Sequence, residues 1–380
     1  MNILHLTYDY PDSINHNKTI AMKEIIDISL EKYPESKYVS LNRVSSLDKK
    51  IINITENGFE ITTFGFPKGI MFRWFLLNSY KNVLRLDLNF KNIDLVHAHK
   101  LTFEGPIAYN LYKKYNIPYI ISIQQTDFKI LKIRKDLKFK YKKILSKAKN
   151  IIFISPWMKS KLKETLGSKF FKTIENKLVN IPLVVEGNLI YNRKIRNKKI
   201  VTAFNMKEKN IKIKNIEIIL EAIRSLKQEN KYIYLDIIGD GNGRNKIIKM
   251  IKEKKLDEQV KLIGLVKNND IIEYMSYYEA FILCSFPETF GMVYIEALKA
   301  GLPIIHSKDA GVDGFFSEYN ISIRVNHKSL DEIKDSILNI NKKRRNIKEL
   351  QNSCKLKSFS REVIKNNYIN LIENIGRKYE

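Results

Sequence analysis

Two glutamates eight residues apart are the side chains in this sequence whose types and spacing point most directly to chemistry. Glu288 follows an apolar run at 280–284 and a Pro-containing turn, and Glu296 comes two helical turns later. At about 1.5 Å rise per residue, a helix separates them by about 12 Å. The helix expected at about 290–300 offers unpaired N–H groups and the positive end of its dipole to an anion. The pair therefore suits a ligand with hydroxyls and phosphates, and two glutamates on a solvated helix face are the simpler alternative.

The whole run from 285 to 305, SFPETFGMVYIEALKAGLPII, resembles the signature of the retaining glycosyltransferases of family 4. That signature reads roughly S-x-x-E-T-F-G-x-x-x-x-E-A-x-x-x-G-x-P. The resemblance implies an α/β protein of GT-B architecture, with two Rossmann-like domains that face across a cleft. It also implies no cofactor or metal, because the donor substrate is a nucleotide sugar (a UDP- or GDP-sugar) and the chain has no Asp-x-Asp element. The matching positions are Ser285, Glu288, Thr289, Phe290, Gly291, Glu296, Ala297, Gly301 and Pro303.

By the same resemblance, Glu296 holds the ribose hydroxyls and Glu288 lies near the donor sugar. Lys214 and the amides around Phe290 and Gly291 stabilise the departing diphosphate. The predicted catalytic residues are Glu288, Asp127 and Lys214. The predicted donor-binding residues are Glu296, Phe290, Gly291, Thr289, Val266, Gly239, Gly241 and Asn205.

Several positions depart from the family pattern. The loop after the first strand, at 14–19, lacks the two glycines that approach the donor phosphates, although Lys18 is an alternative point charge there. Gln124 stands where the family has histidine, and a glutamine cannot move protons near pH 7. Asn205 stands where the family has an arginine, so a neighbouring lysine, Lys207, Lys209 or Lys212, is expected to supply the second cation. The simpler alternative for Lys214 is that it is a solvated lysine without a role in binding.

Two features of the first half have structural alternatives. Asp127 follows a strand at 118–123, and capping of the next helix explains it as well as catalysis does. His97 and His99 lie two apart on a strand and point the same way, but no third or fourth metal ligand is evident in the sequence. We therefore predict no metal site and hold His99 as a candidate acceptor residue.

The domain organisation follows from length and from the alternation of strands and helices. The chain of 380 residues is long enough for two domains. We predict an acceptor-binding domain at 1–190, with a C-terminal helix at 360–380 packing back on it, and a nucleotide-sugar domain at 195–358. A polar, basic stretch at 187–199 is the predicted linker.

The formal charge of +26, from 67 basic and 41 acidic residues, favours an anionic partner, and coding bias toward lysine is the alternative source. The segment 128–150 carries ten Lys or Arg and one acid on a predicted amphipathic helix. Its charges form a solvated face or hold the enzyme at an anionic membrane surface. The helix expected at 71–87 has aromatic residues that suit core packing or, alternatively, a membrane or acceptor.

The sequence contains no run of about 18 apolar residues, and its first residues suit a strand rather than a signal peptide. The two cysteines suit a cytoplasmic protein, and the basic segment adds the expectation that it lies peripherally on the inner face of the plasma membrane. The predicted function is sugar transfer to a lipid-linked or surface-glycan acceptor in polysaccharide, lipopolysaccharide or capsule synthesis. The alternatives are a non-catalytic GT-B glycan- or lipid-binding protein and a GT-B epimerase or phosphorylase. Nucleic-acid binding ranks low, because no recognition motif accompanies the charge.

Overall fold

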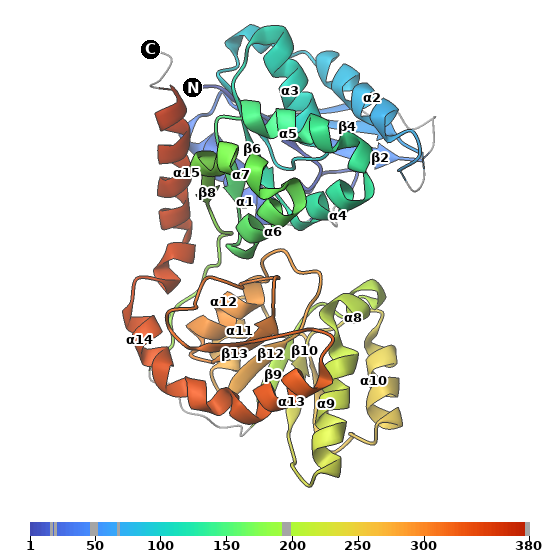
Figure 1. Cartoon of the computed structure of the whole chain (residues 1–380), viewed down its shortest axis with the longest axis vertical. Helices are drawn as coiled ribbons and strands as arrows, with labels where there is room; N and C mark the ends of the chain where they lie inside the picture. The colour runs from blue at the N-terminus through green and yellow to red at the C-terminus, as the bar shows by residue number, and fades with distance from the viewer. Residues whose placement is uncertain (16–17, 19–20, 46–51, 67–68, 192–198, 377–380) are drawn as a thin grey trace. The chain divides into compact units, whose positions relative to one another are not determined.

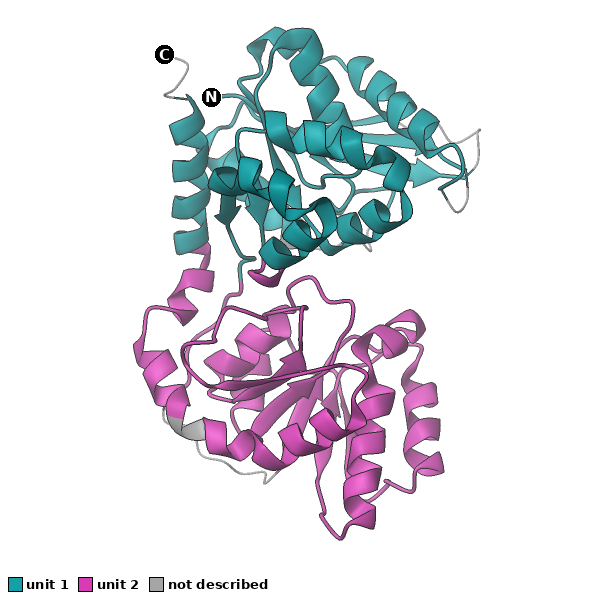
Figure 2. Ribbon diagram, viewed as in Figure 1, with its two compact units in different colours: residues 1–154, 158–184, 362–380 teal, residues 155–157, 185–361 magenta. Residues whose placement is uncertain are grey.

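A computed structural model describes the chain except for residues 16–17, 19–20, 46–51, 67–68, 192–198 and 377–380. The chain divides into two compact units (Figure 2). Unit 1 comprises Met1–Ile154, Met158–Val184 and Glu362–Glu380, and unit 2 comprises Ser155–Trp157 and Val185–Arg361. Most of the predicted linker, at 192–198, lies outside the described residues.

Unit 1 is built on an eight-stranded sheet in the order β3-β4-β2-β1-β5-β6-β7-β8, with helices on its faces (Figure 1). All neighbours are parallel except β3 and β4. Parallel strands covered on both faces are rich in buried Ile, Leu and Val, as β1 shows with five buried residues. The strands are β1 Ile3–Thr7, β2 Lys37–Val44, β3 Ile52–Thr55, β4 Gly58–Phe64, β5 Leu95–Ala98, β6 Tyr119–Ile123, β7 Ile151–Phe153 and β8 Leu178–Asn180.

The helices of unit 1 connect these strands in sequence order. They are α1 Ala21–Lys32, α2 Phe72–Leu84, α3 Glu104–Tyr115, α4 Gln125–Ile133, α5 Lys138–Lys147, α6 Trp157–Leu166, α7 Ser168–Ile174 and α15 Arg361–Gly376, with short 3₁₀ turns at Phe90–Asn92, Lys135–Leu137 and Glu175–Lys177.

Unit 2 has a six-stranded parallel sheet in the order β11-β10-β9-β12-β13-β14. This doubly wound order starts at β9 and reverses direction there, which is where such sheets bind ligands. The elements are β9 Ile200–Ala203, α8 Glu208–Lys214, α9 Ile216–Gln228, β10 Leu235–Ile238, α10 Arg244–Glu253, β11 Val260–Gly264, α11 Ile271–Met275, β12 Ala280–Leu283, α12 Met292–Lys299, β13 Ile304–Ser307, β14 Ser322–Val325, α13 Leu330–Asn339, α14 Ile347–Asn352 and 3₁₀ turns at Ile340–Asn346 and Leu356–Phe359.

The last helix, α15, belongs almost entirely to unit 1, although it follows unit 2 in sequence. Its Tyr368 is fully buried and shares a 2.8 Å hydrogen bond with Nδ1 of His97 in β5. Nearer the end of the helix, Glu373 accepts a hydrogen bond from the Tyr33 hydroxyl. The apolar face of α15, including the buried Ile364 and Ile372, completes the core of unit 1.

The structure confirms the α/β fold with two parallel sheets and corrects three local predictions. The basic segment at 128–150 is not one helix, because Arg134 leaves the helical conformation and binds Asp136 through its guanidinium. The polar loop expected at 205–215 contains the short helix α8. The helix expected at about 290–300 begins only at Met292, because Gly291 adopts a left-handed conformation.

The hydroxyl of Tyr368 anchors α15 inside unit 1, so Tyr368→Phe leaves a buried imidazole nitrogen without its partner. We expect the free energy of unfolding to fall by about 1–3 kcal/mol. Chemical denaturation measures this change. Tyr232→Phe, which alters a ring that is 58% exposed, is the matched control and should leave stability unchanged. Equal stability of both variants would show that the hydrogen bond does not hold the helix.

Candidate active site

The candidate active site of unit 2 lies at the carboxyl edge of its sheet. The loops that follow β9, β10, β11 and β12 meet there, because these strands are parallel neighbours. Open α/β sheets bind ligands at this edge. Every residue predicted to bind the donor belongs to one of these loops or to the first two turns of α12.

An ion pair between Lys214 and Glu288 joins two of these loops. The Lys214 ammonium lies 2.7 Å from Oε2 of Glu288, and both side chains remain partly accessible. Lys214 is the last residue of α8, and Glu288 follows β12. The structure therefore brings together two predicted catalytic residues that are 74 positions apart in sequence.

The start of α12 depends on the absence of a side chain at Gly291. This residue has φ of 75°, and a Cβ there would lie 2.6 Å from the ring of Tyr294 and 3.3 Å from Cγ of Glu288. Within the described part of the chain, no acceptor is recorded for the N–H groups of Phe290 or Gly291. The Phe290 side chain is buried against Phe315, so only its amide can face a ligand.

Glu296 lies on α12, two turns beyond Glu288. Its carboxylate has no recorded hydrogen-bond donor among the residues that the structure describes. Burial raises the pKa of Glu296, and only Lys299 opposes this shift. The Lys299 ammonium itself binds the carbonyl oxygens of Val185 and Gly187. Glu296 thus offers an uncommitted acceptor to hydroxyl groups.

A cavity of about 780 Å³ opens beside the loops after β9, β10 and β11. Its lining includes Asn205, and the side chain of that residue accepts a hydrogen bond from the Lys207 amide. Lys207 and Lys209, two of the lysines expected to supply the second cation, also line this cavity. At β11 the exposed Leu265 lines the cavity, next to the predicted Val266. The full lining is Asn205, Lys207, Glu208, Lys209, Asp240, Gly241, Asn242 and Leu265.

The glycines after β10 are required by the packing of one loop on another. Gly239 has φ of 129°, and a Cβ on it would lie 2.0 Å from the carbonyl oxygen of Phe204. Gly241 has φ of 152°, and its Cβ would lie 2.6 Å from the backbone of Met206. These glycines hold the loops after β9 and β10 together, which shapes the cavity wall.

The predicted catalytic Asp127 of unit 1 is a fully buried capping residue. Its carboxylate accepts hydrogen bonds from the backbone N–H groups of Leu101, Thr102 and Gln124 and from the Thr102 hydroxyl. Burial raises the pKa of Asp127, and these bonds oppose the rise. Asp127 thus caps the start of α4, as the structural alternative in the sequence analysis predicts.

Other predicted positions of unit 1 are also occupied by internal contacts. The Gln124 amide donates to the His99 carbonyl and contacts the sulfur of Met22, so it is not directed at solvent. Lys18 forms a 2.7 Å ion pair with the buried Asp12, and is therefore no free point charge for phosphate. Residues 16, 17 and 19 of the same loop lie outside the described residues.

His99 is fully buried, so its predicted acceptor role is wrong for the side chain as it stands. It stacks on His97 and lies 3.1 Å from Nδ1 of His5, the third imidazole that the sequence analysis missed. Ring nitrogens of the three histidines lie within 4.8 Å of one another. Burial lowers the pKa of each ring, to about 3 for His99, with Lys100 contributing to that shift.

Sequence reasoning also missed a charged group at the carboxyl edge of unit 1. Lys100 follows β5 and binds Asp9, which follows the neighbouring β1, at 2.6 Å. Beside them, Glu104 is fully buried and accepts from the Tyr8 amide, and burial raises its pKa well above the usual value. Charged residues placed directly after neighbouring strands were the signal that could have identified this group.

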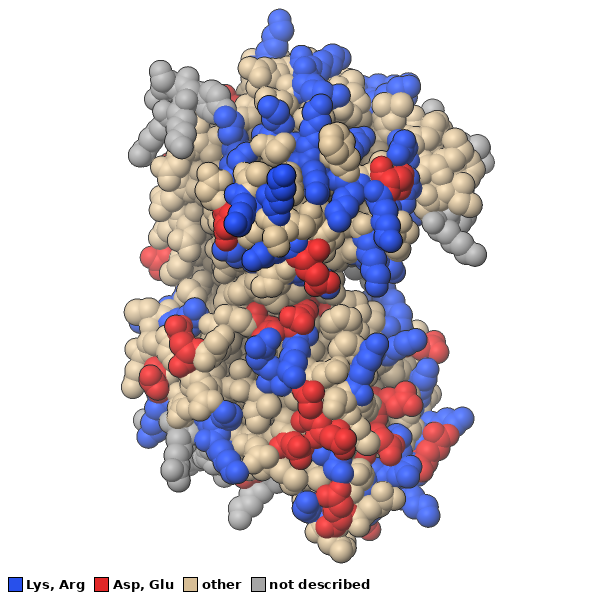
Figure 3. Space-filling view, viewed as in Figure 1, with Lys and Arg blue, Asp and Glu red and all other residues tan. Residues whose placement is uncertain are grey.

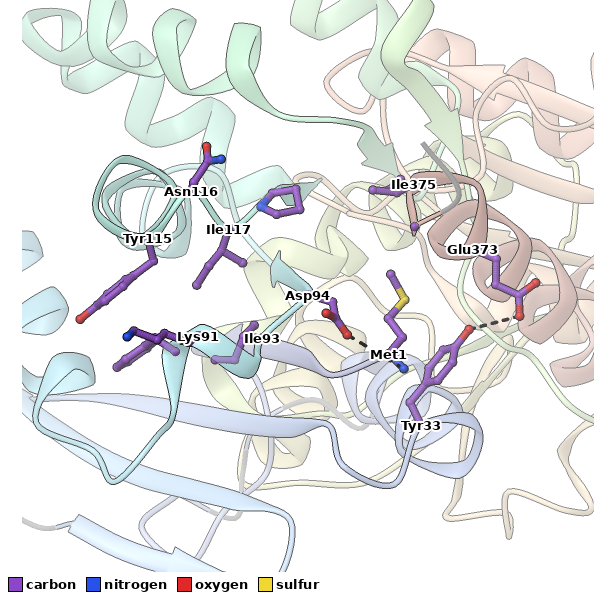
Figure 4. Close-up of a pocket in the computed structure, with 13 residues that line it drawn as sticks. Met1, Tyr33, Lys91, Ile93, Asp94, Tyr115, Asn116, Ile117, Glu373 and Ile375 are labelled. Atoms are coloured by element: carbon purple, nitrogen blue, oxygen red, sulfur yellow. Dashed lines mark hydrogen bonds and ion pairs between the residues drawn. The ribbon is translucent and has the colours of Figure 1, made fainter. Parts of the chain in front are cut away.

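A second cavity, of about 580 Å³, lies at the opposite edge of unit 1 (Figure 4). Asp94 and Ile117 line it just before β5 and β6 begin, and Ile375 of α15 closes one side. Because ligands of parallel sheets bind at the carboxyl ends of the strands, we do not assign this cavity to the active site.

Comparison with known proteins identifies the class and then the family. The fold is that of GT-B glycosyltransferases: the structure of Anabaena HepE in complex with UDP-glucose matches with a TM-score of 0.63 and 14% identity over 98% of this chain and 100% of that one. The model for "Glycosyl transferases group 1" matches residues 192–354, and that for "Glycosyltransferase Family 4" matches residues 46–176. The chain belongs to the group 1, family 4 glycosyltransferases.

Individual relatives are distant. An uncharacterised glycosyltransferase of Methanocaldococcus jannaschii is 24% identical, with 70% of each chain covered. The alpha-monoglucosyldiacylglycerol synthase of Acholeplasma laidlawii is 29% identical over 37% of each chain.

Glu296→Ala removes an uncommitted carboxylate without breaking a recorded ion pair. We expect the Kd of the nucleotide, measured by calorimetry with UDP, or with GDP if UDP does not bind, to rise at least about tenfold. Glu253→Ala, on the exposed face of α10, is the control and should bind like the unmodified protein. Unchanged affinity in the Glu296 variant would remove this residue from the nucleotide site.

Proposed function

We propose that the protein transfers a sugar from a nucleoside diphosphate sugar to an acceptor hydroxyl, with retention of anomeric configuration. The observation that carries the proposal is the Lys214–Glu288 ion pair at the carboxyl edge of unit 2, with the uncommitted Glu296 two turns along α12. The family supports sugar transfer, and the UDP-glucose complex of HepE supports a UDP-sugar as donor.

In the proposed complex the nucleoside occupies the cavity lined by Asn205, Gly241 and Leu265. Glu296 accepts hydrogen bonds from the ribose hydroxyls. Lys214 and the amides of Phe290 and Gly291 face the diphosphate, and Glu288 faces the donor sugar. In this proposal the residues contact the donor in the order base, ribose, diphosphate and sugar.

The reaction breaks the bond between the anomeric carbon and the diphosphate and forms a bond to the acceptor oxygen. Negative charge develops on the departing diphosphate, and preorganised donors stabilise it most effectively. Lys214 and the free amides supply such donors, with Lys207 and Lys209 near the same edge. The acceptor attacks on the face that the diphosphate leaves, and its proton passes to the departing phosphate oxygen. Chelators should therefore leave the rate unchanged.

We further propose that the acceptor lies at an anionic membrane surface. Basic side chains gather over the α3–α5 region of unit 1, whereas acidic and basic residues are mixed on the visible face of unit 2 (Figure 3). The segment 128–150, which includes α4 and α5, carries ten Lys or Arg, and its buried face holds Leu137, Tyr141, Ile144 and Leu145. Among the described helices, none is long and apolar enough to cross a bilayer. The lipid-glycosylating relative named above supports a lipid acceptor.

Glu288→Gln keeps the shape of the side chain but removes the charge that pairs with Lys214. We expect sugar transfer to fall at least about a hundredfold, while nucleotide affinity changes little. Release of UDP from a panel of UDP-sugars, with and without lipid acceptors, measures the rate. Glu258→Gln, an exposed residue of unit 2, is the control. Normal transfer by the Glu288 variant would overturn the assignment of the site.

The membrane proposal is tested by removing exposed charges only. The four exposed lysines Lys132, Lys135, Lys143 and Lys147 are replaced by glutamine. Each is worth about 1 kcal/mol near an anionic leaflet, so partitioning into phosphatidylglycerol vesicles should fall at least about tenfold.

The control removes the same charge from unit 2 by replacing Lys246, Lys249, Lys252 and Lys261, all exposed. An equal loss of partitioning in both variants would mean that net charge acts without a defined membrane-facing surface.

A further inference from the structure

A small apolar cavity of about 220 Å³ lies in unit 1, apart from the residues assigned to the donor. It sits at the carboxyl edge of the sheet, where β2 and β4 end and where Phe103 follows β5. The carboxyl edge of unit 2 holds the proposed donor site, so the same edge of unit 1 is available to an acceptor. The described lining is Arg43, Gly65, Phe66, Gly69, Ile70, Phe72, Phe75, Phe103, Ile130, Ile133 and Arg134.

The interior of this cavity is aromatic. Phe72 and Phe75 of α2 are buried, and each ring packs edge-on against Phe103, at 5.5 and 6.5 Å between centroids. Apart from the two arginines, the described lining consists of apolar side chains and glycines. A sugar or a nucleotide would leave its hydroxyls unpaired there, so the interior favours a hydrocarbon.

The two arginines place positive charge at the cavity. The Arg43 guanidinium donates to the carbonyl oxygens of Gly65 and Phe66 and is otherwise exposed. The Arg134 guanidinium lies 5.2 Å from the centre of the Phe72 ring. Arg134 and Arg73 share one carboxylate, that of Asp136, so the group retains net positive charge.

Apolar side chains surround the cavity on the surface of unit 1. Ile70 and Ile133, which line it, are 60% and 63% exposed, and Phe139, which lies between Lys138 and Lys140 in the sequence, is 82% exposed. Exposed apolar residues interleaved with cations are typical of surfaces that enter the interface of an anionic bilayer. This surface therefore suits a ligand that comes from the membrane rather than from water.

We infer that the cavity between Phe72, Phe103, Ile130 and the two arginines binds one hydrocarbon chain of an anionic lipid, with the lipid phosphate at Arg43 and Arg134. This inference rests on the proposed function, because that lipid is the acceptor or carries it. The cavity is smaller than the 300–1,000 Å³ of pockets that enclose whole small molecules, so it takes only the part of the chain next to the headgroup.

The test uses the full chain and a short-chain probe, dioctanoyl phosphatidylglycerol below its micelle-forming concentration. Calorimetry should show saturable binding of this lipid and none of glycerophosphoglycerol, which has the same headgroup without chains. Ile130→Phe fills the cavity and should weaken lipid binding at least about tenfold. Ile54→Phe, at a side chain of β3 that is 76% exposed, is the control and should bind normally.

Thermal unfolding checks that each variant folds. If Ile130→Phe does not fold, Ile133→Ser at the exposed rim of the cavity replaces it. Lipid binding that is unchanged in the variant that folds, judged by unfolding like the unmodified chain, overturns the inference. Equal binding of the chain-free headgroup also overturns it, because it would show an anion site alone. UDP binding and UDP-sugar hydrolysis are measured on the same variants, so a failed lipid site is distinguished from a failed donor site.

Discussion

The Lys214–Glu288 ion pair is the interaction on which the candidate active site depends. It joins α8, in the loop after β9, to the turn after β12, and these two strands are neighbours in the sheet. The turn is possible because Gly291 adopts a positive φ and has no Cβ, which would clash with the ring of Tyr294. The same turn starts α12 and so sets the position of Glu296. One electrostatic contact and one glycine therefore arrange cation, amides and both carboxylates along a single edge.

The two units use buried charge in different ways. In unit 2 the candidate carboxylates Glu288 and Glu296 stay partly accessible, and Glu296 has no recorded donor in the described structure. In unit 1 Asp127 and Glu104 are fully buried, and three backbone amides and the Thr102 hydroxyl donate to Asp127. A buried carboxylate that is saturated with donors builds a loop and cannot also bind substrate. The proposed acceptor recognition in unit 1 therefore rests on surface features: the aromatic cavity, the arginines and the lysine-rich segment.

The sequence was most informative where periodicity and turn chemistry agree. The parallel strands and the strand, turn and helix that carry Glu288 and Glu296 could be predicted from apolar runs and from the residues that end them, whereas the GT-B architecture and the expected roles of the two glutamates also needed the family resemblance. Long-range partners could not be predicted: the capping role of Asp127 was open from the sequence, but its contact with Thr102, 25 positions away, and the contact of His99 with His5, 94 positions away, were not. The break at Arg134 was missed because its cause, capture of Asp136 by the guanidinium, interrupts a pattern that is otherwise helical. The edge strand β14 was not predicted, because two of its four residues, Ser322 and Arg324, are polar or charged and interrupt the apolar pattern.

Hydrogen exchange of the backbone amides, with and without a bound nucleotide, tests the central claim most directly. If unit 2 binds the donor as proposed, UDP, or GDP should UDP not bind, slows exchange in three segments: 205–215, 239–243 and 288–296. The amides of Phe290 and Gly291, which have no recorded acceptor, should show the largest change. Protection confined to unit 1, or no protection with either nucleotide, would contradict a nucleotide-sugar site at this edge.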